Sequence, residues 1–213
     1  MLNVISLIGC GPQAKYALET FAKTKIKVAE IFDPIGGKLG TRLDRFDIKP
    51  FSDLEELLKN KNSKPVDALI CLSDNRLKDK LFNQLKDRMD FINAIHPGCH
   101  IAGGAALGRG VIVNACTVIQ PNAVIGNGCM LHAGVIVEHD NTIGNFVNLA
   151  PGVTLAGGVS VGRRTTIYTG AIVAPNIKIG SDSIIGAGSV VLSDIPDGVF
   201  ACGSPAKVIR NNS

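Results

Sequence analysis

The chain contains no tryptophan, two tyrosines and four histidines among its 213 residues. A membrane-spanning helix needs about 18 consecutive apolar residues, and the sequence contains no such run. The first residues lack the basic segment followed by an apolar stretch that is typical of a secretory leader. These absences predict a cytoplasmic protein that has no membrane partner.

Charge is also scarce. Charged residues make up 19% of the chain, and the formal net charge at pH 7 is +4. The lysines and arginines are spread along the sequence, so nucleic acid is not an expected partner. Apolar residues make up 46% of the chain, which is enough for a folded core and excludes a disordered protein. The small positive excess suits an anionic small molecule.

The cysteines form no CxxC pair and lie far apart in the sequence. This spacing argues against a disulfide framework or a zinc site, and it favours small buried apolar residues. The few histidines cannot supply the three converging ligands of a catalytic zinc centre, so no metal is expected. The six cysteines are Cys10, Cys71, Cys99, Cys116, Cys129 and Cys202.

A six-residue repeat occupies the second half of the chain. Every sixth residue from 101 to 191 is Ile, Leu or Val, and a second column of mostly small or β-branched residues follows each of these by four positions. Neither a helix, with period 3.6, nor a strand, with period 2, produces a stripe of period six. The sixteen aliphatic positions are Ile101, Leu107, Val113, Ile119, Ile125, Leu131, Val137, Ile143, Leu149, Leu155, Val161, Ile167, Val173, Ile179, Ile185 and Val191.

The period fits a triangular prism in which each hexad forms one side. Three hexads then make one coil of 18 residues, with the large aliphatic side chain pointing inward and the small residue at the corner. Glycine recurs every 18 residues at 108, 126, 144, 162 and 180, where a tight corner would need it. We therefore expect a parallel β-helix of the hexapeptide-repeat type within a second domain, residues 96–213, which ends in a C-terminal tail. Symmetric trimers are usual for this class of repeat.

The first domain, residues 1–95, alternates short apolar runs with helical stretches. The pattern predicts strands at 3–8, 28–32, 68–72 and 91–95, helices at 13–23, 54–58 and 76–86, and a turn at 36–37. Such alternation is typical of a small Rossmann-like α/β domain whose parallel sheet is flanked by helices.

Ligands of such sheets bind at the carboxyl ends of the strands. Those ends carry Gly9 and Gly11, Asp33, and the segment 73–75 that includes Asn75. The Gly9-x-Gly11 turn with Ala14 is an incomplete dinucleotide fingerprint, and Asp33 follows at the distance of a ribose- or base-binding acid. A mononucleotide or a nucleotide sugar is favoured over NAD, and a purely structural domain is the alternative.

One histidine stands out within the repeat. His139 lies two positions after an inward aliphatic residue, between Glu138 and Asp140, which predicts a location at a corner or on the outer face of the prism. A neighbouring carboxylate can hold an imidazole in one tautomer and keep it basic enough to accept a proton. The alternative interpretation is a solvated polar turn.

These motifs resemble the bacterial hexapeptide-repeat acyltransferases that acetylate sugars with acetyl-CoA. The resemblance is strongest to the two-domain group that contains UDP-4-amino-sugar N-acetyltransferases and sialic-acid O-acetyltransferases. It covers nearly the whole chain. The matching segments are Ile95–Pro97, Val137–Asp140, Ile143–Phe146, Leu149–Gly152, Ala156–Val159, Ile185–Gly188 and Gly203–Lys207.

The resemblance implies that the parallel β-helix is left-handed. It also implies a homotrimer with active sites between protomers, a nucleotide-sugar substrate, and acetyl-CoA as the co-substrate without a metal. His139 matches the catalytic base, and Asp140 matches the carboxylate that supports it. The remaining matches are Gly157 at the thioester carbonyl; Asn148, Thr169 and Ala187 along the acetyl and pantetheine track; Lys207 and Arg210 at the coenzyme phosphates; and Gly9, Gly11, Gln13, Asp33 and Asn75 at the nucleotide.

The chain departs from the family pattern at several of these positions. Asn148 replaces a second histidine near the acetyl group, Pro12–Gln13 replaces a Gly-His pair, and Thr169 and Ala187 replace commoner glycines. The leading hypothesis is N-acetylation of a UDP-linked 4-amino sugar. O-acetylation of a sialic-acid-like sugar and a trimeric scaffold without activity remain as alternatives.

Overall fold

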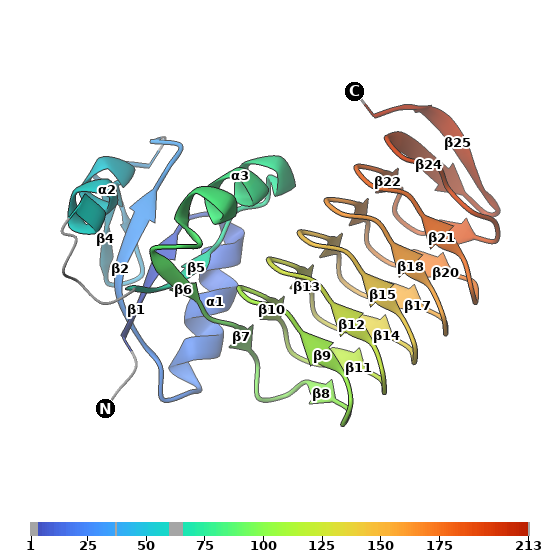
Figure 1. Cartoon of the computed structure of the whole chain (residues 1–213), viewed down its shortest axis with the longest axis horizontal. Coiled ribbons are helices and arrows are strands. Elements are labelled where there is room, and N and C mark those ends of the chain that lie inside the picture. Colours follow the sequence, from blue (N-terminus) through green and yellow to red (C-terminus); the bar gives the residue numbers. More distant parts are fainter. Residues whose placement is uncertain (1–3, 37, 60–65, 213) are drawn as a thin grey trace. The chain divides into compact units, whose positions relative to one another are not determined.

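A computed structural model describes residues 4–36, 38–59 and 66–212. The chain divides into two compact units, Met1–Pro97 and Gly98–Ser213. Figure 1 shows the α/β elements of the first unit and the stacked coils of the second. Residues 3 and 37, which belong to the predicted first strand and the predicted turn, lie outside the described residues.

The first unit is the expected Rossmann-like α/β domain. Its sheet has the order β3-β4-β2-β1-β5-β6, and every pair is parallel except β3–β4. Strands β2 and β4 are added in turn on one side of β1, and β5 and β6 are then added on its other side. The direction in which the sheet grows therefore reverses between β1 and β5. The elements are β1 (Val4–Ile8), α1 (Pro12–Ala22), β2 (Lys27–Asp33), β3 (Arg42–Leu43), β4 (Phe46–Pro50), α2 (Phe51–Lys59), β5 (Val66–Ile70), α3 (Asn75–Leu85), β6 (Met89–Phe91) and β7 (Ala94–Ile95).

The central strands are buried on both faces, as the apolar runs predicted. Leu7, Ile31 and Leu69, on β1, β2 and β5, are completely buried. Helix α3 begins at a capping residue, because the side chain of Asp74 accepts hydrogen bonds from the backbone N–H groups of Arg76 and Leu77. The cap orients the segment that follows β5, where the sequence predicted ligand contacts.

Two features of this unit were not predicted. The β3–β4 hairpin turns through Asp44, whose φ is 54°, and its strands are too short or too polar to show a β period. The predicted strand 91–95 is instead two separate strands: β6 ends at Phe91, β7 begins at Ala94, and the two belong to different sheets.

The second unit is the predicted prism. Sixteen two-residue strands, β8 to β23, recur at intervals of six, and each ends on one of the sixteen aliphatic residues. Their bounds are β8 (His100–Ile101), β9 (Ala106–Leu107), β10 (Ile112–Val113), β11 (Val118–Ile119), β12 (Val124–Ile125), β13 (Met130–Leu131), β14 (Ile136–Val137), β15 (Thr142–Ile143), β16 (Asn148–Leu149), β17 (Thr154–Leu155), β18 (Ser160–Val161), β19 (Thr166–Ile167), β20 (Ile172–Val173), β21 (Lys178–Ile179), β22 (Ile184–Ile185) and β23 (Val190–Val191).

Each strand pairs in parallel with the strand 18 residues away, which forms three faces. The first face contains β10, β13, β16, β19 and β22, the second runs from β8 to β23, and the third from β9 to β21. The corners between these faces are named by the faces that they join. The inward aliphatic and small residues form one continuous core from Val111 to Ala206.

The glycines of the 18-residue column lie at the third–first corner, and they are required by close approach. A Cβ on Gly126 would lie 2.7 Å from the backbone nitrogen of Asn145, and one on Gly144 would lie 2.8 Å from that of Arg163. None of these glycines has a positive φ; the positive φ values of each corner belong to a following residue, such as Phe146 or Arg164. The expectation that a tight corner needs glycine is therefore confirmed for the close approach of the backbone, and the unusual backbone angles occur at the following residue instead.

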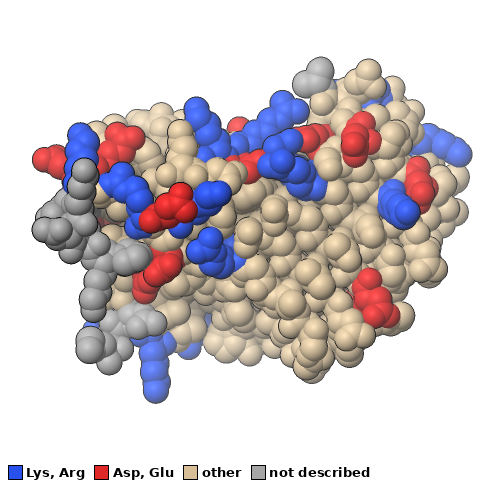
Figure 2. Space-filling model, viewed as in Figure 1, with Lys and Arg blue, Asp and Glu red and all other residues tan. Residues whose placement is uncertain are grey.

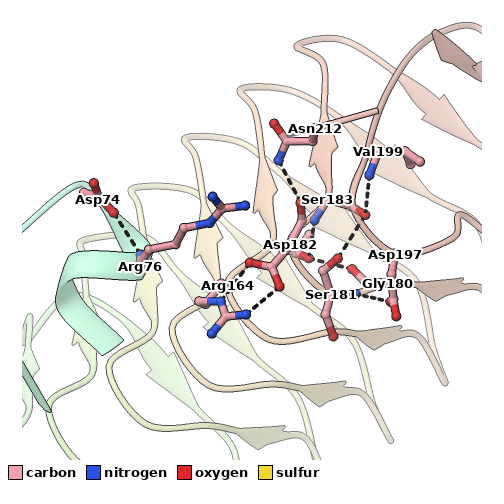
Figure 3. A network of polar contacts seen from close by, with 11 residues as sticks. Asp74, Arg76, Arg164, Gly180, Ser181, Asp182, Ser183, Asp197, Val199 and Asn212 are labelled. Carbon is pink, nitrogen blue, oxygen red and sulfur yellow. Dashed lines mark hydrogen bonds and ion pairs between the residues drawn. The ribbon is translucent and has the colours of Figure 1, made fainter. Parts of the chain in front are cut away.

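The C-terminal end is closed by the antiparallel pair β24 (Val199–Gly203) and β25 (Ala206–Asn211). Figure 3 shows the polar contacts at the neighbouring third–first corner. The Arg164 guanidinium donates two hydrogen bonds to the Asp182 carboxylate, at 2.8 and 2.6 Å, and the Asn212 side chain donates to the Asp182 backbone carbonyl at 2.7 Å. These contacts attach the end of the chain to the last coils.

Within the described ranges, no helix is long and apolar enough to cross a bilayer. The same residues contain no cluster of three or more His, Cys, Asp or Glu side chains that could hold a metal ion. The six cysteines are free thiols. Cys10, Cys71 and Cys129 are buried as predicted, whereas Cys116 is exposed because it occupies a corner with a φ of 60°.

Candidate active site

His139 lies at the second–third corner, between β14 and β15. Asp140 occupies the turn of this corner with a φ of 62°. The His139 side chain is 62% exposed and that of Asp140 is 56% exposed. The predicted location outside the prism core is therefore observed.

The imidazole contacts the carboxylate that the sequence placed beside it. His139 Nδ1 lies 2.7 Å from Asp140 Oδ2, and the Asn122 side-chain amide donates a hydrogen bond to Asp140 Oδ1 at 3.0 Å. Hydrogen bonds from His139 and then Asn122 hold the pKa of Asp140 below its usual value. An ionised carboxylate only accepts hydrogen bonds, so Nδ1 of His139 is the donor and Nε2 of the neutral ring carries the lone pair.

The other side of the imidazole lies against Gly157, one coil further along the same corner. A Cβ on Gly157 would lie 2.7 Å from both Cε1 and Nε2 of His139. The backbone N–H of Gly158 donates to the His139 carbonyl at 3.0 Å, which fixes the spacing between these two successive coils at the second–third corner. The ring is thus held between Asp140 and the backbone of Gly157.

The remaining residues predicted along the coenzyme track lie elsewhere on the prism. Asn148 is on β16 of the first face, and Thr169 and Ala187 are exposed at the first–second corner. The Asn148 Oδ1 atom is buried and has no hydrogen-bond partner among the described residues. One protomer does not bring these three residues together with His139.

Lys207 and Arg210 are exposed on the terminal strand β25. The Arg210 guanidinium lies over the Phe200 ring, 5.2 Å from its centroid, and donates to the Asn211 carbonyl at 3.1 Å. Lys207 and Arg210 are both exposed, so the pair remains a candidate for phosphate binding.

The first unit contains a cavity of about 380 Å³ at the carboxyl ends of β1, β2 and β5. It lies at the reversal of the sheet order, where ligands of such folds usually bind. Of the predicted nucleotide residues, Gly11, Gln13 and Asp33 line it. Gly9 and Asn75 do not: Gly9 packs against the Cys71 carbonyl, which a Cβ would approach within 2.6 Å, and Asn75 begins α3.

The cavity walls are preorganised by hydrogen bonds. Asp33 is buried, and its carboxylate accepts from the Cys10 thiol at 3.2 Å and from the Ile35 backbone N–H at 3.0 Å. Burial and the contact with Asp33 raise the pKa of Cys10 to about 11, so Cys10 is a neutral thiol donor at pH 7. Ser73 donates to Gln13 Oε1 at 2.9 Å.

The sequence interpretation missed Asn122, and it missed Lys38 among the residues that line the cavity, whereas Ser73 lies in the predicted segment 73–75 and does line it. The 18-residue period could have identified Asn122, because it places that residue directly below Asp140. No comparable period exists in the α/β unit, where the contacts join separate loops.

Residues 158–193 match the family model described as bacterial transferase hexapeptide (six repeats). No curated protein matched the chain. Among solved structures, PerB from Caulobacter crescentus, in complex with CoA and GDP-perosamine, is 35% identical with a TM-score of 0.87 over 98% of both chains.

Two further structures cover the chain to a similar extent. A histidine-to-alanine variant of GDP-perosamine N-acetyltransferase from Caulobacter crescentus, in complex with CoA and GDP-perosamine, is 33% identical, with a TM-score of 0.90 over 99% of both chains. The acetyltransferase domain of PglB from Neisseria gonorrhoeae, in complex with acetyl-CoA, is 26% identical, with a TM-score of 0.88 over 98% of this chain and all of that domain. The repeat match, the common two-unit fold and this identity show that the chain belongs to the two-domain hexapeptide-repeat family of acetyl-CoA-dependent sugar acetyltransferases.

Proposed function

We propose that this protein transfers the acetyl group of acetyl-CoA to the amino group of an amino sugar carried by a nucleotide, with His139 as the general base. The observation that carries the proposal is the orientation of His139, whose Nδ1 faces Asp140 at 2.7 Å and whose Nε2 is left to accept a proton. Support comes from the Caulobacter crescentus relatives, whose structures contain CoA and GDP-perosamine.

The reaction follows from these groups. The sugar amine attacks the thioester carbon, and Nε2 of His139 takes the proton that the nitrogen releases. The thioester C–S bond then breaks, the acetyl group stays on the sugar nitrogen, and the CoA thiolate leaves and is protonated. Backbone N–H groups near Gly157 would stabilise the transient negative charge on the acetyl oxygen. Asp140 stabilises the imidazolium formed on His139.

The site needs two protomers in this proposal. His139 and Gly157 lie at the second–third corner, whereas Thr169 and Ala187 lie at the first–second corner. The second face separates these two corners, so they cannot meet within one protomer. A second copy must therefore supply the first–second corner. In a closed ring of three copies, every second–third corner can meet the first–second corner of its neighbour.

The surface of the second unit agrees with self-association. The outward positions of the second face include Val118, Ile136, Ile172 and Val190, and Ile172 is 49% exposed in the single chain. Figure 2 shows few charged residues over much of the visible surface of this unit. Such a face is typical of a surface that is covered in an oligomer.

The nucleotide would occupy the cavity of the first unit. Asp33 can accept hydrogen bonds from a base or a ribose, and Gln13 can contact a base or a phosphate. Both UDP and GDP sugars are candidates: the sequence resemblance suggested UDP, and the crystallised relatives hold GDP-perosamine. Lys207 and Arg210 would bind the phosphates of the coenzyme, and we propose that the reaction takes place in the cytoplasm.

The direct test measures thiol release from acetyl-CoA with three acceptors: a GDP-linked 4-amino sugar, a UDP-linked 4-amino sugar, and a sialic-acid-like sugar. We expect turnover with at least one nucleotide-linked amino sugar, and mass spectrometry should find the acetyl group on nitrogen. Turnover with the sialic-acid-like sugar alone would indicate O-acetylation instead. If no heat of binding with acetyl-CoA is found in calorimetry, the protein is a scaffold.

Replacement of Asp33 tests the nucleotide cavity. In the Asp33→Asn variant one carboxylate oxygen becomes an NH₂ group, which cannot accept from Cys10 or from a nucleotide donor. We expect the KM of the nucleotide sugar to rise about 10- to 100-fold, because one or two hydrogen bonds to a charged group are lost. The KM of acetyl-CoA should change little. The exposed helix residue Asp53, changed to Asn, is the matched control. An unchanged nucleotide-sugar KM would exclude this cavity as the nucleotide site.

A further inference from the structure

Asn122 occupies the position one coil before Asp140 at the second–third corner. The two residues are 18 positions apart, and both adopt a left-handed backbone conformation, with φ values of 63° and 62°. The backbone N–H of Asp140 donates to the Pro121 carbonyl at 3.1 Å, which holds the two corners in register. The side chains of Asn122 and Asp140 therefore leave the backbone side by side.

Each oxygen of the Asp140 carboxylate has a different partner. Asn122 Nδ2 donates to Oδ1 at 3.0 Å, and His139 Nδ1 lies 2.7 Å from Oδ2. The Asp140 side chain is 56% exposed, so without the amide the carboxylate could turn toward water. A carboxylate that is held at Oδ1 presents Oδ2 in one direction, which is where the imidazole lies.

We propose that Asn122 is a positioning residue for catalysis, which fixes the Asp140 carboxylate and thereby the tautomer and orientation of the His139 ring. This inference rests on the proposed role of His139 as the base. Asn122 does not touch the substrates in this account; it acts through Asp140. Residues that orient a functional histidine through hydrogen bonds to its other ring nitrogen commonly affect activity without taking part in the chemistry.

The test uses Asn122→Gly, because glycine accepts the positive φ and removes only the side chain. The matched control is Asn176→Gly, which changes the same residue type at the same corner, with a φ of 61°, two coils beyond Asp140. We expect Asn122→Gly to lower kcat about 3- to 10-fold, a modest fraction of the effect of losing the base, with both KM values unchanged. Asn176→Gly should retain the kcat of the unmodified protein.

A second readout reports on the ring itself. Nitrogen-15 NMR of the imidazole should show His139 protonated at Nδ1 in the unmodified protein, and a mixture of the two neutral tautomers in Asn122→Gly. In Asn122→Asp, two carboxylates would face each other, and we expect a larger fall in kcat than in the glycine variant. A purely structural role would lower thermal stability in Asn122→Gly without changing the tautomer population.

These outcomes separate this inference from the proposed function. An unchanged kcat and an unchanged tautomer population in Asn122→Gly would overturn the role of Asn122 while leaving His139 as the base. A fully active His139→Ala variant would overturn the proposed base, whereas the NMR measurement would still report whether Asn122 orients the ring.

Discussion

Replacement of His139 by alanine is expected to lower kcat about 10²- to 10⁴-fold, the usual contribution of a general base. The variant removes the only imidazole at the second–third corner among the described residues, and water would have to accept the proton of the attacking amine. The binding of both substrates should persist, so the KM values should change little. Thiol release from acetyl-CoA at saturating substrate measures the effect.

The matched control for this variant is His100→Ala. His100 is also exposed on the prism, but it lies on β8 in the first coil, away from Asp140. It should retain the activity of the unmodified protein. If His139→Ala keeps more than about a tenth of the original kcat, less than general-base catalysis normally supplies, another group takes the proton and the proposed mechanism is wrong.

The second large effect is expected from Gly157→Ala. The added Cβ would lie 2.7 Å from Cε1 and Nε2 of His139, far inside van der Waals contact. The ring must then rotate, because the backbone of Gly157 is held by its coil, and rotation breaks the 2.7 Å contact with Asp140. Displacement of a reacting group by about 1 Å can lower activity about 100-fold, and we expect a loss of kcat of that order.

The chain offers a close control for this substitution in Gly103→Ala. Gly103 occupies the same place in its hexad, two coils before His139, and a Cβ there would meet no atom within 4 Å. Both variants should fold, and only Gly157→Ala should lose activity. An active Gly157→Ala variant would mean that the orientation of the imidazole seen here is not the one used in catalysis.

The hexad period made most of the second unit predictable. Each hexad repeats the same pattern of an inward aliphatic residue and a small corner residue. The sixteen aliphatic positions therefore all indicate the same structure. The structure of the α/β unit was less predictable from the sequence. The strand Phe46–Pro50 is short, polar and ends in proline, and its pairing partner has two residues, so only the tertiary fold reveals the hairpin.

The candidate site was predicted where its residues are adjacent in sequence and missed where they are adjacent only in space. His139 and Asp140 are neighbours in the chain, and their pairing could be inferred directly. Asn122 meets Asp140 only because coils stack every 18 residues. The base of the proposed nucleotide was not predictable, because a buried carboxylate such as Asp33 can accept hydrogen bonds from either uracil or guanine.

The central claim is that one protomer supplies His139 and its neighbour supplies the corner that contains Ala187. It is tested most directly by mixing two inactive variants, His139→Ala and Ala187→Trp, in one population of oligomers, with mixed assembly verified by native mass spectrometry. Each variant alone should be inactive, and random mixing should restore about a quarter of the original activity, because one interface in four then has both intact halves. Mixed oligomers that stay as inactive as either parent, or an Ala187→Trp variant that is active alone, would contradict the account.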